Sequence, residues 1–129
     1  MENKQIKWTF FWDMYSGGAA KEPYEEIYIE APRDEAIVIF YNRFGHNPLR
    51  VTCACCGCDY SVEERDTLDK ASAYHRNCEW DQGANCYKTE TGKSIAEYEK
   101  QKNVLIIRDS EIKADERVGE VPIDEYEWL

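Results

Sequence analysis

Four cysteines lie close together near the middle of this chain, at Cys53, Cys55, Cys56 and Cys58. They form two overlapping Cys-x-x-Cys pairs, Cys53 with Cys56 and Cys55 with Cys58. Two cysteines at this spacing can direct both sulfur atoms toward one tetrahedral zinc ion, at Zn–S distances of roughly 2.3 Å. Gly57 favours the first pair, because a zinc knuckle needs a residue that tolerates positive φ directly after its second ligand. The sequence therefore predicts that Cys53 and Cys56 are half of a zinc site.

The other half of the site must come from a distant part of the chain. His75 and Cys78 are one helical turn apart and would share a face if this stretch is helical, and Cys86 follows them. The predicted zinc ligands are Cys53, Cys56, Cys78 and Cys86. His75 is the main alternative for the fourth position, and Cys55 and Cys58 could also replace their neighbours.

Two other interpretations of the cysteines are weaker. Cysteine is often a small buried hydrophobe, but six cysteines in 129 residues, four of them clustered, favour a metal site. A disulfide framework is typical of exported proteins, and the N-terminus has neither an apolar signal region nor a small-residue cleavage site. The sequence also has no apolar run of the roughly 20 residues that a membrane helix needs. It therefore predicts a cytoplasmic protein with reduced thiols.

The chain is strongly acidic, with 26 Asp and Glu against 16 Lys and Arg, a formal net charge of −10 and a pI near 4.7. Because duplex DNA carries about one negative charge per 1.7 Å of its axis, such a surface disfavours direct nucleic-acid binding. It favours basic partners, including proteins that themselves hold DNA or RNA, although acidity also keeps small proteins in solution. The acids predicted to contact a partner are Glu22, Glu25, Glu26, Glu30, Asp34, Glu35, Asp124, Glu125 and Glu127.

Motifs for catalysis are missing from the sequence. There are two histidines, and neither G-x-S-x-G, H-E-x-x-H, the kinase set nor the zinc-deaminase signature occurs. A site rich in sulfur ligands is typically closed and structural, whereas a catalytic zinc keeps one position open. The sequence therefore predicts a protein that is not an enzyme.

The pattern of apolar residues and helix caps predicts a small α+β fold. Strands are expected over residues 5–14, 26–31, 49–52, 59–62 and, as an interior strand, 104–108. Helices are expected from Pro32 to a stop at Gly45, after a Thr67 cap as far as residue 77, and over residues 95–102 after a capping box. Residues 63–66 are expected to form a charged turn and residues 79–93 a loop.

We therefore expect one domain over residues 1–129, with an antiparallel or mixed sheet, two to three helices and the zinc knuckle. Its last segment, residues 111–129, is acidic. Parts of this segment are expected to dock on the rest of the domain, because it also carries the apolar residues Val118, Val121, Ile123, Tyr126 and Trp128.

Three stretches of the chain resemble a family of small, uncharacterised bacteriophage proteins. They are residues 34–45, residues 50–57 with the Cys-x-Cys-Cys-Gly turn followed by Asp59 and Tyr60, and residues 104–113. The resemblance covers most of the chain and brings no assigned activity. It includes a cysteine that matches Cys78, whereas Cys58, His75 and Cys86 are less typical. What it implies is a phage-encoded accessory protein that works inside a bacterial cell.

Net charge, small size and this resemblance together lead to two functional hypotheses. The first is a non-enzymatic phage protein that binds a host protein and inhibits or modulates it. Its sharpest form is an anti-defence inhibitor of the anti-CRISPR type, whose acids mimic nucleic acid and occupy a basic channel. The alternative is a zinc-stabilised adaptor or regulatory module in transcription or replication, which would use Arg43, His46, Arg50 and exposed aromatic residues.

Overall fold

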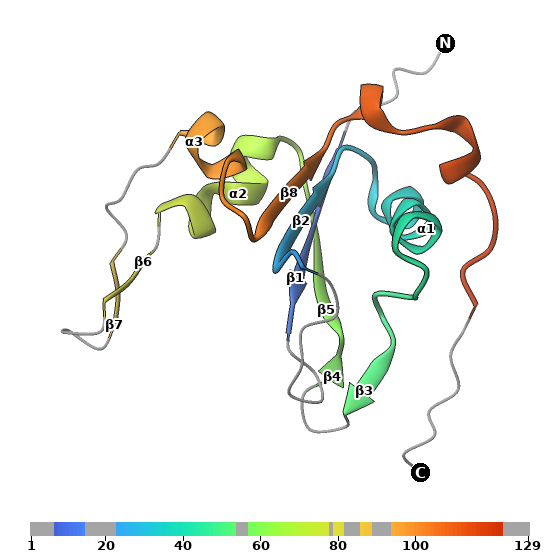
Figure 1. The fold of residues 1–129 in the computed structure, drawn as a ribbon, viewed down its shortest axis with the longest axis horizontal. Helices are drawn as coiled ribbons and strands as arrows, with labels where there is room; N and C mark the ends of the chain where they lie inside the picture. Colours follow the sequence, from blue (N-terminus) through green and yellow to red (C-terminus); the bar gives the residue numbers. More distant parts are fainter. Residues whose placement is uncertain are drawn as a thin grey trace.

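The computed structural model describes residues 7–14, 23–53, 57–77, 79–81, 86–88 and 94–122. Within these ranges, only the backbone of residues 52–53, 73–77, 79–81 and 86–88 is described. The main sheet contains β1 (Trp8–Asp13), β2 (Glu26–Ile29), β5 (Tyr60–Arg65) and β8 (Val104–Ile107), in the order β5-β1-β2-β8. β1 is antiparallel to both neighbours, and β8 is parallel to β2, so the sheet is mixed (Figure 1).

One face of the sheet is covered by α1 (Arg33–Phe44). The sequence predicts the end of this helix at Gly45, whereas the helix begins at Arg33, one residue after the predicted start at Pro32. Pro32 is the N-cap, and Gly45 ends the helix at φ 82°, with its N–H donating to the carbonyl oxygen of Tyr41 at 2.8 Å. The core on this face contains Phe11, Ile27, Ile29, Ala31, Ala36, Ile37, Ile39, Phe40, Tyr60, Ile107 and Ile112.

The other face is covered by α2 (Leu68–Asn77) and α3 (Ile95–Glu99), which lie across the sheet from α1 in Figure 1. Both predicted caps are present, because the Lys70 N–H donates to Thr67 Oγ1 at 3.1 Å and the Glu97 N–H donates to Ser94 Oγ at 3.2 Å. α3 ends at Glu99 rather than at the predicted residue 102. The core on this face contains Trp8, Phe10, Tyr28, Ala71, Tyr98, Val104 and Ile106.

β8 corrects one expectation from the sequence. The continuous apolar run at 104–108 predicts an interior strand, but β8 lies at the end of the sheet in the part of the chain that the structure describes. The run is apolar because both faces of the strand are covered. Val104 and Ile106 pack toward α3, and Ile107 packs toward α1.

Two short hairpins accompany the sheet, β3 (Val51–Cys53) with β4 (Gly57–Cys58) and β6 (Glu79–Asp81) with β7 (Cys86–Lys88). The second hairpin occupies part of the predicted loop at 79–93. The predicted turn at 63–66 is also wrong for most of its length, because β5 continues to Arg65, which pairs with Trp8. Its charged residues lie on an edge strand, where charge discourages pairing with other chains.

The described chain is thus a small α+β fold with a four-stranded mixed sheet and three α-helices, as the sequence predicts. Among its described residues, no helix has the length and apolar character needed to span a membrane.

The segment after β8 docks against α1 and against the turn that follows α1, where Asn47 Nδ2 donates to the carbonyl oxygen of Pro122 at 3.1 Å. It contains two 3₁₀ turns, η2 (Asp109–Glu111) and η3 (Ala114–Glu116). Ile112 is buried in the core beneath α1 and Val121 packs against the same core, which confirms the predicted docking for Val121. Val118, by contrast, is 66% exposed. The predicted docking residues Ile123, Tyr126 and Trp128 lie outside the described residues.

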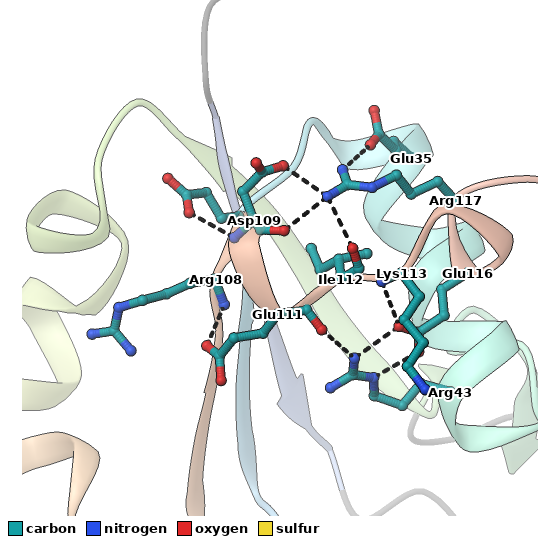
Figure 2. A network of polar contacts seen from close by, with 10 residues as sticks. Glu35, Arg43, Arg108, Asp109, Glu111, Ile112, Lys113, Glu116 and Arg117 are labelled. Carbon is teal, nitrogen blue, oxygen red and sulfur yellow. Dashed lines mark hydrogen bonds and ion pairs between the residues drawn. The ribbon is translucent and has the colours of Figure 1, made fainter.

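Side chains of α1 hold this segment mainly by polar contacts (Figure 2). Arg43 donates from Nε and Nη2 to the two carboxylate oxygens of Glu116, each at 3.0 Å. Asn42 Nδ2 donates to the carbonyl oxygens of Glu116 and Val118 at 2.8 and 3.0 Å. Arg117 closes the network, because its guanidinium donates to Glu35 at 3.0 Å and to Asp109 at 2.8 Å.

The pair between Arg43 and Glu116 predicts a contribution to stability that depends on pH. The hydrogen bonds from Arg43 hold the pKa of Glu116 below its usual value. The carboxylate therefore stabilises the fold above the pKa of Glu in the unfolded chain, and this stabilisation is lost as the pH falls through the lower folded-state pKa. We expect Glu116→Gln to reduce the free energy of unfolding by about 1 kcal/mol near neutral pH.

Urea unfolding of both proteins over a series of decreasing pH values measures this effect. The difference between wild type and Glu116→Gln should shrink toward zero in acid. The exposed neighbour Glu120 provides the control, since Glu120→Gln makes the same chemical change and should leave stability unchanged. A difference that stays constant with pH would show that the ion pair is not its source.

Candidate metal-binding and partner-binding sites

The β3–β4 hairpin carries the cysteine cluster. Val51 pairs with Cys58 and Cys53 pairs with Gly57, so the chain reverses direction between Cys53 and Gly57. Gly57 has φ 79°, as the sequence predicts for the residue after the second ligand of a knuckle. A Cβ at Gly57 would have no atom within 4 Å, so it is the backbone conformation that requires glycine here. The hairpin therefore has the reversal and the left-handed residue that a knuckle needs.

An ion pair closes the base of this hairpin. The Asp59 N–H donates to the carbonyl oxygen of Arg50 at 2.7 Å, and Arg50 Nε donates to Asp59 Oδ2 at 3.2 Å. The carboxylate of Asp59 is completely buried, whereas the side chain of Arg50 is 40% exposed. The sequence does not predict that Arg50 and Asp59 form an ion pair, because a single Arg and a single Asp on either side of a cysteine cluster form no motif.

The structure describes only part of the predicted zinc site. Cys53 ends β3, Cys86 begins β7 and His75 lies in α2, with their backbones alone described. Cys56 and Cys78 lie outside the described residues. Figure 1 shows β3–β4 at one end of the sheet and β6–β7 at the side, beyond α2 and α3, so the two hairpins are not brought together.

The alternative knuckle residues differ in the same way. Cys58 is described, and its thiol is half-buried and free, whereas Cys55 lies outside the described residues. Where side chains are described, no three His, Cys, Asp or Glu residues form a group that could hold a metal ion. The ligand set from the sequence therefore stays a prediction.

Glu26 is one of the acids predicted to contact a partner, and that prediction is wrong. Glu26 is only 7% exposed and faces the core under α3. The hydroxyl of Tyr98 donates to Glu26 Oε1 and lies 3.1 Å from the hydroxyl of Tyr28. Burial raises the pKa of Tyr98, so its hydroxyl stays protonated and remains a donor. The alternation of Glu26 with Tyr28 on β2 was the signal that both share the buried face.

The other described acids of the predicted surface differ in how freely they face solvent. The side chain of Asp34 is fully exposed in the first turn of α1. Glu30 accepts a hydrogen bond from the Asp109 N–H at 2.8 Å, and Glu35 accepts from Arg117. Glu25 accepts from Asn103 Nδ2 at 3.0 Å. The remaining acids of the predicted surface, Glu22, Asp124, Glu125 and Glu127, lie outside the described residues.

The basic patch that the alternative hypothesis needs is engaged within the fold. Arg43 binds Glu116, and Arg50 binds Asp59. His46 packs with its ring perpendicular to Phe40, at a centroid distance of 5.4 Å. Sequence reasoning missed these partners because Glu116 is far from Arg43 along the chain and no local pattern links them. Each of the three residues thus contacts another part of the fold, and Arg50 keeps 40% of its side chain exposed.

Comparison with family models, with curated proteins and with solved structures finds no match to this chain.

Proposed function

We propose that this chain is a non-enzymatic, acidic binding protein that inhibits or modulates a basic host protein, and that its cysteine hairpin holds a structural zinc ion. The observation that carries the first part is how the arginines are used. Six described arginines form ion pairs within the fold, namely Arg33, Arg43, Arg50, Arg65, Arg108 and Arg117. The excess of acidic over basic residues therefore determines the electrostatic field around the protein.

Ion pairing leaves the charge balance of the chain unchanged. Each internal pair neutralises one cation with one anion, so the formal charge of −10 is unchanged while fewer cations remain to face a partner. Asp115 and Glu120 are exposed acids, and Asp34 is exposed although it lies 3.8 Å from the guanidinium of Arg33. Such a surface attracts basic proteins and repels nucleic acid over distances of about 10 Å at moderate salt.

The resemblance to bacteriophage proteins supports a partner in the bacterial cytoplasm. A basic channel that holds DNA or RNA is the partner that an acidic protein can block most directly, because the acids compete with phosphates for the same Lys and Arg side chains. An anti-defence inhibitor of the anti-CRISPR type is the sharpest form of this proposal.

Binding to such a partner should depend steeply on salt and on the exposed acids of the α1 end. Pull-down from a bacterial lysate with the tagged full chain, followed by identification, should recover a basic nucleic-acid-binding protein. We expect Asp34→Lys to weaken its binding to that protein, and added oligonucleotide to compete. Asp69→Lys makes the same charge change on α2, across the sheet from α1, and should have the smaller effect.

Two outcomes would contradict this proposal. Binding that persists at high salt and in the presence of oligonucleotide would exclude charge mimicry. A gel shift of DNA or RNA by the chain itself at physiological salt would favour the adaptor hypothesis instead.

The zinc part of the proposal is supported by the reversal at Cys53–Gly57 and by the number of thiols near it. Zinc at a sulfur-rich site is held in a closed tetrahedron and contributes directly to folding. The ligands that we propose from this hairpin are Cys53 and Cys56. Cys78 is the proposed third ligand, and His75 is the alternative to Cys86, because Cys86 begins a hairpin that lies apart from β3–β4 in Figure 1.

Elemental analysis of the purified chain should find about one zinc ion per molecule. Chelation should unfold the protein, as followed by circular dichroism, because binding energy at a structural site is folding energy. Cys56→Ser should lose the zinc, whereas Cys58→Ser should retain it if Cys53 and Cys56 are the pair. Retention of zinc by Cys56→Ser would transfer the role to Cys55 and Cys58, and a chelated protein that stays folded would contradict a structural role.

A further inference from the structure

We propose that two copies of this chain pair through β8, each adding its edge strand antiparallel to that of the other across a two-fold axis. The result is a dimer with one continuous sheet. Pairing at β8 requires neither the zinc site nor the basic partner proposed above.

The two edges of the described sheet differ in charge. β5 forms one edge and carries Glu63, Glu64 and Arg65, and charges of this kind discourage pairing with another chain. β8 forms the other edge, and its sequence, Val-Leu-Ile-Ile over Val104–Ile107, contains no charged residue. An apolar edge strand without charges is the kind that accepts a further strand. The described sheet is therefore protected at β5 and open to pairing at β8.

The backbone of β8 offers hydrogen-bonding groups on its outer side. The Glu30 N–H donates to the carbonyl oxygen of Ile107 at 2.9 Å, so Ile107 directs its backbone toward β2. Because this direction alternates along a strand, Ile106 directs its N–H and C=O away from β2. The Val104 N–H also points outward, but it donates to the carbonyl oxygen of Gln101 at 3.2 Å. Ile106 is therefore the residue at which a second strand can form a pair of backbone hydrogen bonds.

Charges at the two ends of β8 select the direction of that second strand. The exposed residues Lys100 and Lys102 lie in the turn before β8, whereas the exposed residues Asp109 and Glu111 lie in η2 after it. Antiparallel pairing of two copies brings the basic turn of each copy toward the acidic η2 of the other. Parallel pairing would place like charges together, which is unfavourable. The strand that fits this edge is therefore β8 of a second copy, running in the opposite direction.

Charge also selects the register of the pair. With Ile106 opposite Ile106 of the second copy, the two residues exchange N–H···O=C bonds, and Lys102 lies opposite Ser110, between the two acids of η2. A shift that places Leu105 opposite itself would set Lys102 against Arg108 and bring two cations together. A contact about a two-fold axis is closed at two copies. Because four residues of each strand form it, the interface is small, and the dimer should dissociate on dilution.

Sedimentation equilibrium of the full chain, in reducing buffer over a concentration series, tests the dimer. The average mass should rise from 15.1 kDa toward about twice that value. Lys102→Glu should weaken dimerisation by roughly 5- to 10-fold, because it places an acid against η2 of the other copy at both symmetric contacts. Lys102→Glu combined with Ser110→Lys should restore it, since opposite charges then face each other again. Lys70→Glu makes the same charge change at an exposed position of α2 and should match the wild type.

Amide hydrogen exchange locates the contact on the sheet. The Ile106 N–H should become protected as the concentration of the chain rises, because it then donates to the second copy. The amides of β5 should show no such change, since that edge stays unpaired in the dimer.

Four outcomes would overturn the proposal. They are a chain that stays at 15.1 kDa throughout the concentration series, a dimer of unchanged affinity in Lys102→Glu, association that continues beyond two copies, and a dimer without protection at Ile106. Protection of Ile106 that arises only when a different protein is added would assign the β8 edge to that protein and would likewise contradict pairing between copies.

Discussion

Burial of both faces of β1 and β2 is the constraint on which the rest of the molecule depends. Phe11 packs against Phe40 of α1 with ring centroids 4.8 Å apart, while Phe10 stacks on Tyr28 at 4.5 Å on the other face. Because neither face can be left to water, α1 must cross one side of the sheet and α2 and α3 the other (Figure 1). The short hairpins and the C-terminal segment are then confined to the ends and rim of this three-layer body.

Polar groups at the boundaries of these layers are satisfied by specific partners, two of which are distant in sequence. Tyr98 donates a hydrogen bond to Glu26 in the core beneath α3, and Arg50 donates to Asp59 at the base of the cysteine hairpin. Arg43 of α1 donates to Glu116 of η3. Leaving any of these buried or half-buried charges without its partner would be more costly than the pair is stabilising. The fold therefore uses its arginines internally, which is why the charge of the surface cannot be read from composition alone.

Local signals in the sequence predicted the parts of the fold that depend on local chemistry. Helix starts are marked by Thr67 and Ser94, whose side chains accept hydrogen bonds from backbone N–H groups three residues later. The ends of α1 are marked by the backbone conformations of Pro32 and Gly45, and the hairpin is marked by the positive φ of Gly57. Non-local properties were missed. An apolar run cannot distinguish an interior strand from an edge strand that is covered on both faces, and for this reason β8 was predicted to be an interior strand. The partners of Glu26 and Arg43 depend on tertiary contacts that no spacing rule supplies.

The antiparallel pairing of β1 with β2 also separates the two proposed functional regions. Asp13 and Met14, at the end of β1, lie beside the start of β2 and hold the base of the cysteine hairpin, since Met14 bonds to Asp59 and Asp13 bonds to Glu25. The opposite end of β2 leads into Glu30 and the first turn of α1, where Asp34 is exposed. A metal ion at the hairpin would thus lie at the opposite end of the sheet from Asp34, whereas Glu25 of the predicted acidic surface lies at the same end as the hairpin. The charge at Asp34 and the cysteines of the hairpin can therefore be altered independently, because the paired strands β1 and β2 lie between them.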